Sequence, residues 1–416
     1  MKSSSSHLPS LLLSLLFILG SVSLISIGFF AAFAAIVSYV NKQSVQVVSI
    51  ILSFAYGFEG LLIGLITVFT IQKFFQNPYA DQDINIQLTL LNLLAGGFGA
   101  AAALWIGSLV QVRESINWLI LPLLTIPAVV LPIWLVFKFG VQKLPLGERW
   151  QAWSMLGLGM TLAPLIILIL ELGTLIVIGV MVVIYIASQP NLVTEFQSMA
   201  QQITRLQPDS PELLNLLKPY ITKPITILLI LSYFSFIIPV IEELIKPLGV
   251  WLFHKQIESV AQGFAFGALC GTGYALAETF GVSGQVSEWS TLLTTRIGTG
   301  LLHITASGIM GAGITGALRY KRYLFFIRSY ILSVLLHGLW NATAVAYSFS
   351  TNEIFHTETQ TKPWIVSVTY LGLFAVALML IVLLFINNRK YTNSISLAPE
   401  ATTSSSIESP QDQNNS

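Results

Sequence analysis

Two glutamates and a lysine lie close together in an apolar segment near the middle of the chain, PVIEELIKP at residues 239–247. On a helix, Lys246 follows Glu243 by three residues and Glu242 by four, so its ammonium can reach either carboxylate. Adjacent carboxyl groups oppose each other's ionisation where the dielectric is low, so one of them suits general-base chemistry. Pro239 and Pro247 remove backbone donors and can kink the helix. The alternative interpretation is a structural Glu–Lys pair at a helix end.

A second apolar segment combines small residues with one acid. Gly263, Gly267 and Gly271 repeat every four residues and form one smooth helix face, on which another helix can pack closely. Glu278 follows Gly271 by seven residues and falls near the same face. We expect the glycines to serve packing. Glu278 is either a functional carboxyl or a polar residue at the end of the helix.

Two further segments carry the histidines. Arg296 and His303 are seven residues apart and therefore share a helix face. His337 and Asn341 are one turn apart, so the amide of Asn341 can orient the imidazole. A single histidine in an apolar helix is more often a satisfied hydrogen-bonding group than a ligand. Two of them, beside three glutamates in neighbouring segments, favour one shared site.

The composition shows what kind of protein positions these groups. The chain has 416 residues, of which 54% are hydrophobic and only 9% charged, and its mean hydropathy is +0.77. Soluble domains carry about 25% charged residues, so an ordinary soluble protein is excluded. A net charge of +1 excludes a nucleic-acid binder with a basic face. The single cysteine, Cys270, can form neither an intrachain disulfide nor a thiolate zinc cluster.

The apolar runs predict an all-α polytopic membrane protein with about ten transmembrane helices, since a bilayer span needs about 20 apolar residues. The runs are long and unbroken and lack the alternation of a membrane β-barrel. The predicted limits are 11–40, 47–72, 87–111, 117–139, 153–187, 224–253, 260–281, 296–318, 326–349 and 364–387.

Lys and Arg residues predict the orientation of these helices. With both termini in the cytoplasm, 13 of the 20 Lys and Arg residues lie on the cytoplasmic side, as the positive-inside rule requires. The segment 188–222 is then an extracytoplasmic amphipathic loop. Within it, an interfacial helix is indicated by Leu213, Leu214, Leu216 and Leu217.

We therefore predict five regions, with the polar membrane residues concentrated in the third. Glu59 and Glu171 lie in the first region without comparable neighbours, and we interpret each as a neutral or hydrogen-bonded carboxyl between helices. The predicted regions are an N-terminal membrane bundle of about five helices at 1–187, the amphipathic loop at 188–222, a membrane domain that carries the candidate catalytic residues at 223–350, a loop and last helix at 351–388, and a disordered cytoplasmic tail at 389–416.

Four motifs in a fixed order form a fairly specific signature: Glu-Glu-x-x-Lys at 242–246, Gly-x-Gly-Tyr-Ala-x-x-Glu at 271–278, Arg296 followed by His303, and His337-x-x-Trp340-Asn341. Their order and spacing resemble the PrsW-type intramembrane protease family, a relative of the CAAX prenyl protease and abortive-infection protein group. The resemblance covers residues 224–350. Where that family has Glu-Asn at the end of its second motif, this chain has Glu278-Thr279.

The resemblance implies a peptidase, metallo- or glutamate-type, that hydrolyses membrane-anchored protein substrates in the bacterial plasma membrane. It implies a catalytic set of Glu242, Glu243, Glu278, His303 and His337, supported by Lys246, Arg296 and Asn341. In that scheme, Glu243 or Glu242 takes a proton from water. His303 and His337 either stabilise the tetrahedral intermediate or, with Glu243, bind one divalent metal ion such as zinc. The chain has no His-Glu-x-x-His motif, so the metal-dependent and metal-free versions both stay open.

Two other functions fit the same composition. A proton-coupled transporter also needs acids and imidazoles inside the membrane, although the sequence has no inverted repeat. A non-catalytic scaffold would bind single-span partners through the glycine faces. Oligomeric state has no sequence signal.

The heights of the motifs in the membrane predict where a shared site would lie. At about 1.5 Å per residue, Glu278 lies roughly 27 Å from the cytoplasmic start of its helix, whereas His303 lies only about 10 Å below the outer surface if its helix begins at Arg296. We expect the groups to meet in a water-filled pocket that opens outward, provided that the Glu-Glu helix is long or broken at Pro247.

Overall fold

The computed structural model describes residues 7–41, 46–207, 210–351 and 363–396. Within these ranges the chain is helical, and the only β-type pairing is an isolated bridge between Asp83 and Glu148. Ten helical segments of the described residues are long and apolar enough to cross a membrane. In lipid a helix satisfies its own backbone hydrogen bonds, which explains why apolar runs of this length become helices. The protein is an all-α polytopic membrane protein, as predicted.

The ten segments follow the predicted order, with the largest shifts at the start of the eighth segment and the end of the tenth. They are α1 (Leu8–Val40), α2 (Val47–Phe74), α3 (Leu90–Val110), α4 (Asn117–Val141), α5 with α6 (Arg149–Met160 and Leu162–Ala187), α9 to α11 with a π-helical turn η1 (Pro224–Ser232, Tyr233–Ile237, Ile238–Ile245 and Leu248–Phe253), α12 (Val260–Val282), α13 (Trp289–Tyr320), α14 (Tyr323–Thr351) and α15 (Pro363–Ser396).

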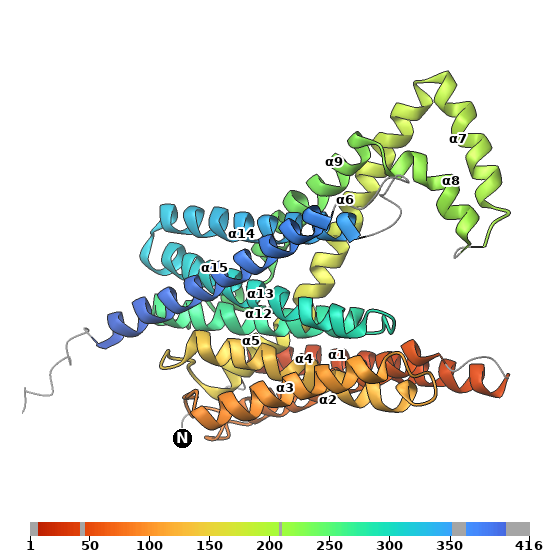
Figure 1. Ribbon diagram of the computed structural model, residues 1–416. Coiled ribbons are helices and arrows are strands. Elements are labelled where there is room, and N and C mark those ends of the chain that lie inside the picture. The colour runs from red at the N-terminus through yellow and green to blue at the C-terminus, as the bar shows by residue number, and fades with distance from the viewer. Residues whose placement is uncertain (1–6, 42–45, 208–209, 352–362, 397–416) are drawn as a thin grey trace, which may run out of the picture.

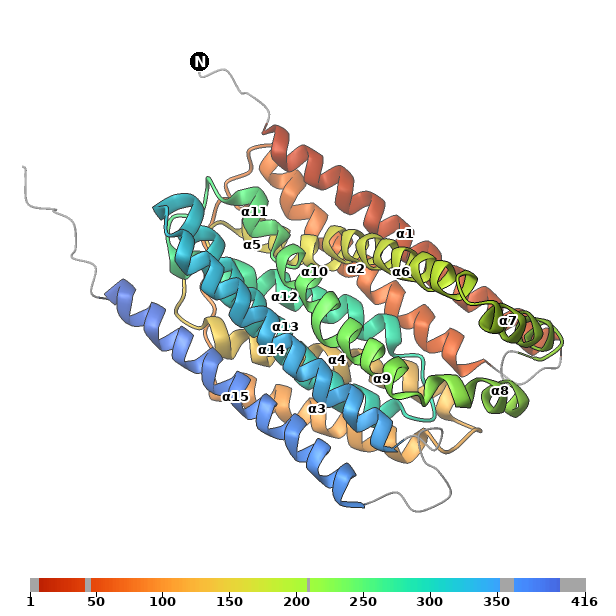
Figure 2. The ribbon, with the colours of Figure 1, turned by 90° about the horizontal axis from the view of Figure 1, so that it is seen from above.

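Most of these helices run between the same two ends of the molecule (Figure 1). The beginning of α1 and the end of α15 lie at one end, as an even number of crossings requires (Figure 2). Two helices occupy the centre: the most apolar window of α12 is 89% buried and that of α13 is 94% buried, against 39% or less in the other spans. Helices α12 and α13 therefore form the core on which the rest pack.

Glycines let α12 and α13 approach backbone to backbone, as the repeat of small residues predicts. A Cβ atom added at Gly267 would collide with the carbonyl oxygen of Ser307, and one at Gly271 with that of His303. No flexible side chain can move aside at either point. The glycine face of α12 thus sets the distance between the two central helices and the height of His303 relative to Gly271.

The segment predicted as an extracytoplasmic loop contains two helices, α7 (Pro190–Ile203) and α8 (Pro211–Ile221). Together they form an arm that projects from the bundle beyond α6 and α9 (Figure 1). The predicted leucine-rich helix corresponds to α8, whereas α7 was not expected from the sequence. The hydroxyl of Tyr220 donates to Glu195 Oε1 at 2.6 Å and its ring contacts Phe196, so the two helices are tied together.

The last helix is longer than predicted. We expect a disordered tail from residue 389, but α15 continues through residues 389–396. Tyr391 explains the difference, because its side chain is buried and its ring packs against Phe264 at a centroid distance of 5.3 Å. The rest of the predicted tail, residues 397–416, lies outside the described residues. So do residues 352–362, between the last two predicted spans.

Candidate active site

The four predicted motifs come together between α10, α12, α13 and α14. Glu242, Glu243, His303 and His337 are buried there, and the side chain of Glu278 is 34% exposed. Helices far apart in the sequence supply them, since α10 packs against both α13 and α14. The structure therefore brings the five acidic and imidazole groups into one cluster, which we call the Glu–His cluster.

Breaks in the α9–α11 segment position the two glutamates. The π-helical turn η1 precedes α10, and π-helical turns interrupt the regular hydrogen-bond ladder. Pro247, with φ −80° and ψ 35°, separates α10 from α11. Of the two alternatives, a long helix or one broken at Pro247, the structure has the break. It leaves Glu242, Glu243 and Lys246 on a short helical piece whose direction is set by its packing on α13 and α14.

Lys246 lies at the centre of the Glu–His cluster, and its side chain is fully buried. Its Nζ atom lies 2.7 Å from Glu242 Oε2, 2.8 Å from Glu243 Oε1 and 2.7 Å from His303 Nδ1. Nζ hydrogen-bonds to Glu243 and His303, whereas its contact with Glu242 Oε2 is an ion pair without hydrogen-bond geometry. The fourth neighbour of Nζ is His337 Nδ1, which lies farther from it, at 3.4 Å.

The contacts of His303 determine which ring nitrogen carries its proton. Nδ1 accepts from Lys246, and Nε2 lies 2.7 Å from Glu278 Oε2. Because a carboxylate only accepts hydrogen bonds, the proton belongs on Nε2. Both nitrogens of His303 are thus engaged, and neither is free to reach a substrate in this arrangement.

His337 has the opposite pattern. Its Nδ1 lies 2.8 Å from Glu243 Oε1 and donates to it, since that carboxylate oxygen can only accept. In the neutral ring, Nε2 is then an unprotonated acceptor. This nitrogen lies 3.9 Å from the carboxylate oxygen Oε2 of Glu242. His337 Nε2 and Glu242 Oε2 are therefore two neighbouring acceptor atoms in the cluster.

Arg296 and Thr279 support the cluster from the side of Glu278. Arg296 Nη2 lies 2.5 Å from Glu278 Oε2, and its Nε donates to Thr279 Oγ1 at 3.4 Å. A threonine hydroxyl can accept a hydrogen bond as an asparagine side-chain carbonyl can. Thr279, the residue after Glu278, thus helps to orient the arginine.

Glu278 and His303 were expected at different heights in the membrane. They lie at one level because α13 starts earlier than expected. The helix begins at Trp289 rather than near Arg296, so His303 lies about 21 Å along it, not 10 Å. Glu278 lies close to the end of α12, and helical side chains lean toward the N-terminus of their helix. Its carboxylate therefore reaches back to the level of His303.

Asn341 has a different role from the one its spacing suggests. Its Nδ2 donates to the backbone oxygen of Phe234 at 2.8 Å, a residue of η1. It thus positions the π-helical turn relative to α14, whereas the expected contact was with the imidazole of His337. The adjacent Trp340 donates from Nε1 to Thr299 Oγ1 at 3.3 Å and joins α14 to α13.

Glu171 also reaches the cluster, which the sequence analysis did not anticipate. Its side chain lies beside that of Glu242, and its backbone oxygen accepts from the hydroxyl of Tyr233 at 3.3 Å. The sequence indicated a carboxyl without functional neighbours, whereas the structure places Glu171 next to a member of the cluster. Glu59 is buried on α2, and none of the hydrogen bonds or ion pairs found among the described residues joins it to the cluster.

The cluster offers metal-binding atoms, but Lys246 lies among them. Glu242, Glu243 and His303 each present one such atom, all within 4.8 Å of one another, and Glu243 Oε2 is buried without a partner among the described residues. Zinc takes such donors at about 2.0–2.2 Å. The Lys246 Nζ atom already lies 2.7–2.8 Å from the same three side chains. The donor types suit a metal ion, but together with Lys246 in this position they do not fit one.

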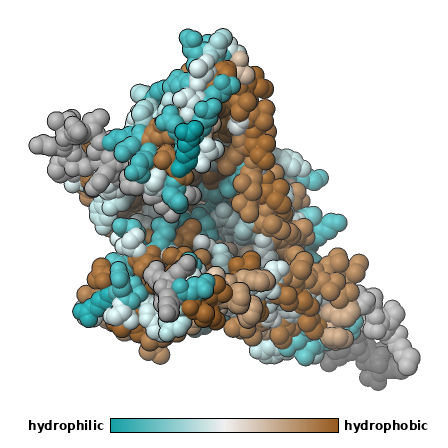
Figure 3. Space-filling model, turned by 90° about the vertical axis from the view of Figure 1, so that its right-hand side faces the viewer, coloured by the Kyte–Doolittle hydropathy of each residue, from teal (hydrophilic) through white to brown (hydrophobic). Residues whose placement is uncertain are grey.

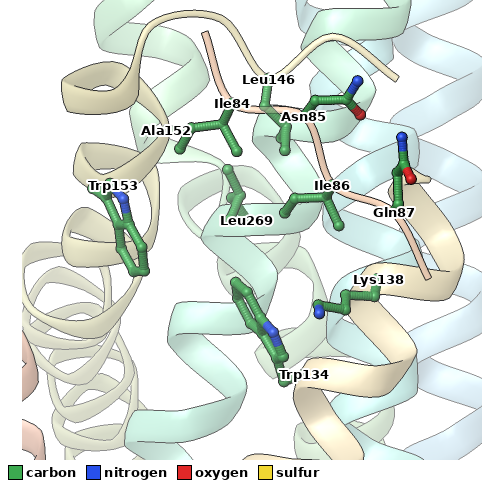
Figure 4. A pocket seen from close by; sticks show the side chains of 10 residues that line it. All are labelled: Ile84, Asn85, Ile86, Gln87, Trp134, Lys138, Leu146, Ala152, Trp153 and Leu269. Carbon is green, nitrogen blue, oxygen red and sulfur yellow. The ribbon is translucent and has the colours of Figure 1, made fainter. Parts of the chain in front are cut away.

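A recess in the surface lies beside the arm. Figure 3 shows one end of the molecule hollowed between the α7–α8 arm and the bundle, with hydrophilic residues in the hollow. A separate cavity of about 470 Å³ lies between residues 84–87 and helices α4 and α5 (Figure 4). Its only charged side chain, Lys138, donates to Asn92 Oδ1 at 3.2 Å. That cavity contains no member of the Glu–His cluster.

Comparisons of the chain with curated proteins and with solved structures found no match. A comparison with protein families gave a match to 213–391, which includes the whole Glu–His cluster and Lys246 but not Glu171. Residues 213–391 of this chain are similar to the family described as PrsW family intramembrane metalloprotease.

Proposed function

We propose that the protein is an intramembrane protease that hydrolyses a peptide bond of membrane-anchored protein substrates. The observation that carries this proposal is the Glu–His cluster itself, three carboxyl groups and two imidazoles that meet between buried helices. Ionisable groups are costly inside a bilayer and mark functional sites there. The similarity of residues 213–391 to an intramembrane protease family supports the same activity.

Glu242 is the general base in this proposal. Its side chain is 8% exposed, whereas that of Glu243 is fully buried. Glu243 Oε1 is also occupied by Lys246 and His337 Nδ1, both at 2.8 Å. Glu243 therefore positions the lysine and the imidazole, and Glu242 is the carboxylate that water and substrate can approach.

The hydrolytic water binds between Glu242 Oε2 and His337 Nε2. These acceptor atoms are 3.9 Å apart, so one water molecule can donate a hydrogen bond to each of them. A water held by both protons directs its lone pairs away from them, toward a substrate carbonyl. This geometry meets the first requirement of general-base catalysis, which is a base within hydrogen-bond reach of the proton it removes.

The reaction then balances without another reactant. The water oxygen bonds to the carbonyl carbon of the substrate while Glu242 accepts one water proton. Breakage of the carbon–nitrogen bond releases the amine, to which Glu242 returns that proton, and the new carboxyl group keeps the water oxygen. The Lys246 ammonium, 2.7 Å from Glu242 Oε2, holds the carboxylate of the base in place during these steps.

Substrates reach this site from the bilayer. We propose a location in the bacterial plasma membrane, and the imbalance of Lys and Arg between the two sides supports an orientation with both termini in the cytoplasm. Glu278, at 34% side-chain exposure, is the most open member of the cluster and lies near the end of α12 that faces outward in this orientation. A membrane-anchored chain would be cut near that surface.

Co-expression with tagged single-span proteins tests the function. Wild type is expected to release a tagged fragment that Glu242→Gln and His337→Ala do not release. Glu59→Gln is the matched control, because it changes a buried membrane carboxyl outside the cluster. A fragment that persists in both cluster variants would contradict the proposal. Proton-coupled uptake into vesicles, lost in the same variants, would favour a transporter instead.

A further inference from the structure

The cation at the centre of the Glu–His cluster is a side chain of the protein. We propose that Lys246 takes the place of a divalent metal ion in this site, so that the site works without a bound metal. The proposal deepens the proposed proteolysis and rests on it for the consequence in catalysis. The placement of the ammonium among the donor atoms can be tested without any activity.

The first argument is that the two cations compete for one position. The three atoms nearest to Nζ come from Glu242, Glu243 and His303, the same residues that form the possible metal-binding group. A zinc ion would need those atoms at about 2.0–2.2 Å, which leaves no room for an ammonium between them. Placing a divalent ion beside the ammonium would also bring like charges together in a medium of low dielectric.

The second argument is that Lys246 cannot leave the position easily. Its side chain is fully buried, and its Nζ lies 4.9 Å from the centre of the Tyr274 ring. Its backbone N–H donates to the carbonyl oxygen of Glu242 at 2.8 Å, just before the break at Pro247. A metal ion would have to displace a buried charge from two carboxylates, and an unpaired buried charge is very costly.

The third argument is chemical. A catalytic zinc keeps one open coordination position for water or substrate. The Lys246 ammonium is enclosed by four side chains, with Nζ within 3.4 Å of an atom of Glu242, Glu243, His303 and His337, so it has no open position. Lys246 is therefore a positioning residue. It orients the base and fixes the His303 tautomer, and the contact with water is left to Glu242 and His337.

The test measures metal binding by the full-length protein in detergent. Wild type is incubated with zinc, and in a parallel sample with Co²⁺ as a spectroscopic probe, then freed of unbound ions and assayed for metal per chain. We expect no stoichiometric ion and no ligand-field absorption. Lys246→Met removes the charge but keeps the length of the side chain, and we expect it to gain one Co²⁺ per chain. Adding His303→Ala to that variant is expected to abolish the gain.

One zinc ion per chain in wild type that is lost in His303→Ala would overturn the proposal. So would a folded Lys246→Met variant that binds no cobalt, because the donors would then not form a metal site. If Lys246→Met fails to fold, the metal content of wild type and the survival of its cleavage activity after exhaustive chelation decide the question. Wild type that binds no metal and cleaves nothing would refute the proposed function while leaving the placement of Lys246 intact.

Discussion

The Nε2 atom of His303 lies 2.7 Å from Oε2 of Glu278, across the interface of the two most buried helices. This contact directs the other ring nitrogen toward Lys246 and fixes the tautomer of the imidazole. Glu278 in turn is held by Arg296. A chain of charged and polar groups therefore runs from the exposed end of α12 to the buried centre of the cluster.

Loss of the Glu278 carboxylate should slow cleavage by misorienting His303. We expect Glu278→Ala to lower kcat about 10- to 100-fold, the range typical when the partner of an oriented imidazole is removed. Glu278→Gln should lose less, because its amide oxygen still accepts from Nε2. Initial rates on a purified single-span substrate measure the effect. Glu288→Ala, at the start of α13, is the control, and equal losses in Glu278→Ala and Glu288→Ala would contradict the assignment.

Glu171 should matter although it lies outside the region similar to the protease family. Its side chain lies beside Glu242, and Glu171→Gln keeps an amide there that can donate to the carboxylate, whereas Glu171→Leu does not. We expect Glu171→Gln to retain most activity and Glu171→Leu to lose roughly tenfold, the scale of one lost hydrogen bond to a charged group. Cleavage rates of both variants provide the measurement. Full activity in Glu171→Leu would show that α6 does not contribute to the site.

The close contact of α12 and α13 should make Gly267 intolerant of any side chain. Gly267→Ala places a methyl group against the Ser307 carbonyl, and we expect it to lower the free energy of unfolding by about 1–3 kcal/mol. Gly173→Ala on α6 is the matched control, since a Cβ there meets nothing within 4 Å. Removing a helix glycine should leave that variant equal to or more stable than wild type. Thermal unfolding in detergent compares them, and similar midpoints for the two variants would contradict the packing argument.

The predicted orientation can be tested with single cysteines. Cys270 is buried, so the chain provides a silent background. We expect Gln201→Cys on the α7–α8 arm to react with a membrane-impermeant thiol reagent in intact cells. Lys143→Cys, in the connection between α4 and α5, should react only after the membrane is opened. The reverse pattern would invert the topology and place the exposed end of α12 on the cytoplasmic side.

The helices were predictable because their signal is local. A bilayer span needs a run of apolar residues, and such runs can be read directly from the chain. The early start of α13 was missed because residues 289–296 contain a serine and three threonines, which lower the hydropathy although the segment is helical. The helix at 389–396 was also missed because its residues are polar. A tertiary contact of Tyr391 stabilises it, and the sequence does not show such a contact.

The cluster was predictable only in part. Helical spacing identified the faces that carry Glu242, Glu278, His303 and His337, because it depends on one helix at a time. The approach of Glu171 could not be predicted, since α6 meets α10 only through packing and no spacing links them. The central position of Lys246 was also hidden. Its spacing along the helix predicts contacts with Glu242 and Glu243. Its contact with His303 depends instead on the break at Pro247 and on the height of α13.

Cleavage in water enriched with oxygen-18 tests the central claim most directly. Purified wild type is incubated with a single-span substrate, and mass spectrometry follows the new C-terminal carboxyl group. We predict one oxygen-18 atom in that carboxyl for wild type and no product for Glu242→Gln, with Glu59→Gln behaving as wild type. A product formed equally by wild type and Glu242→Gln, or one without the label, would contradict hydrolysis by this cluster.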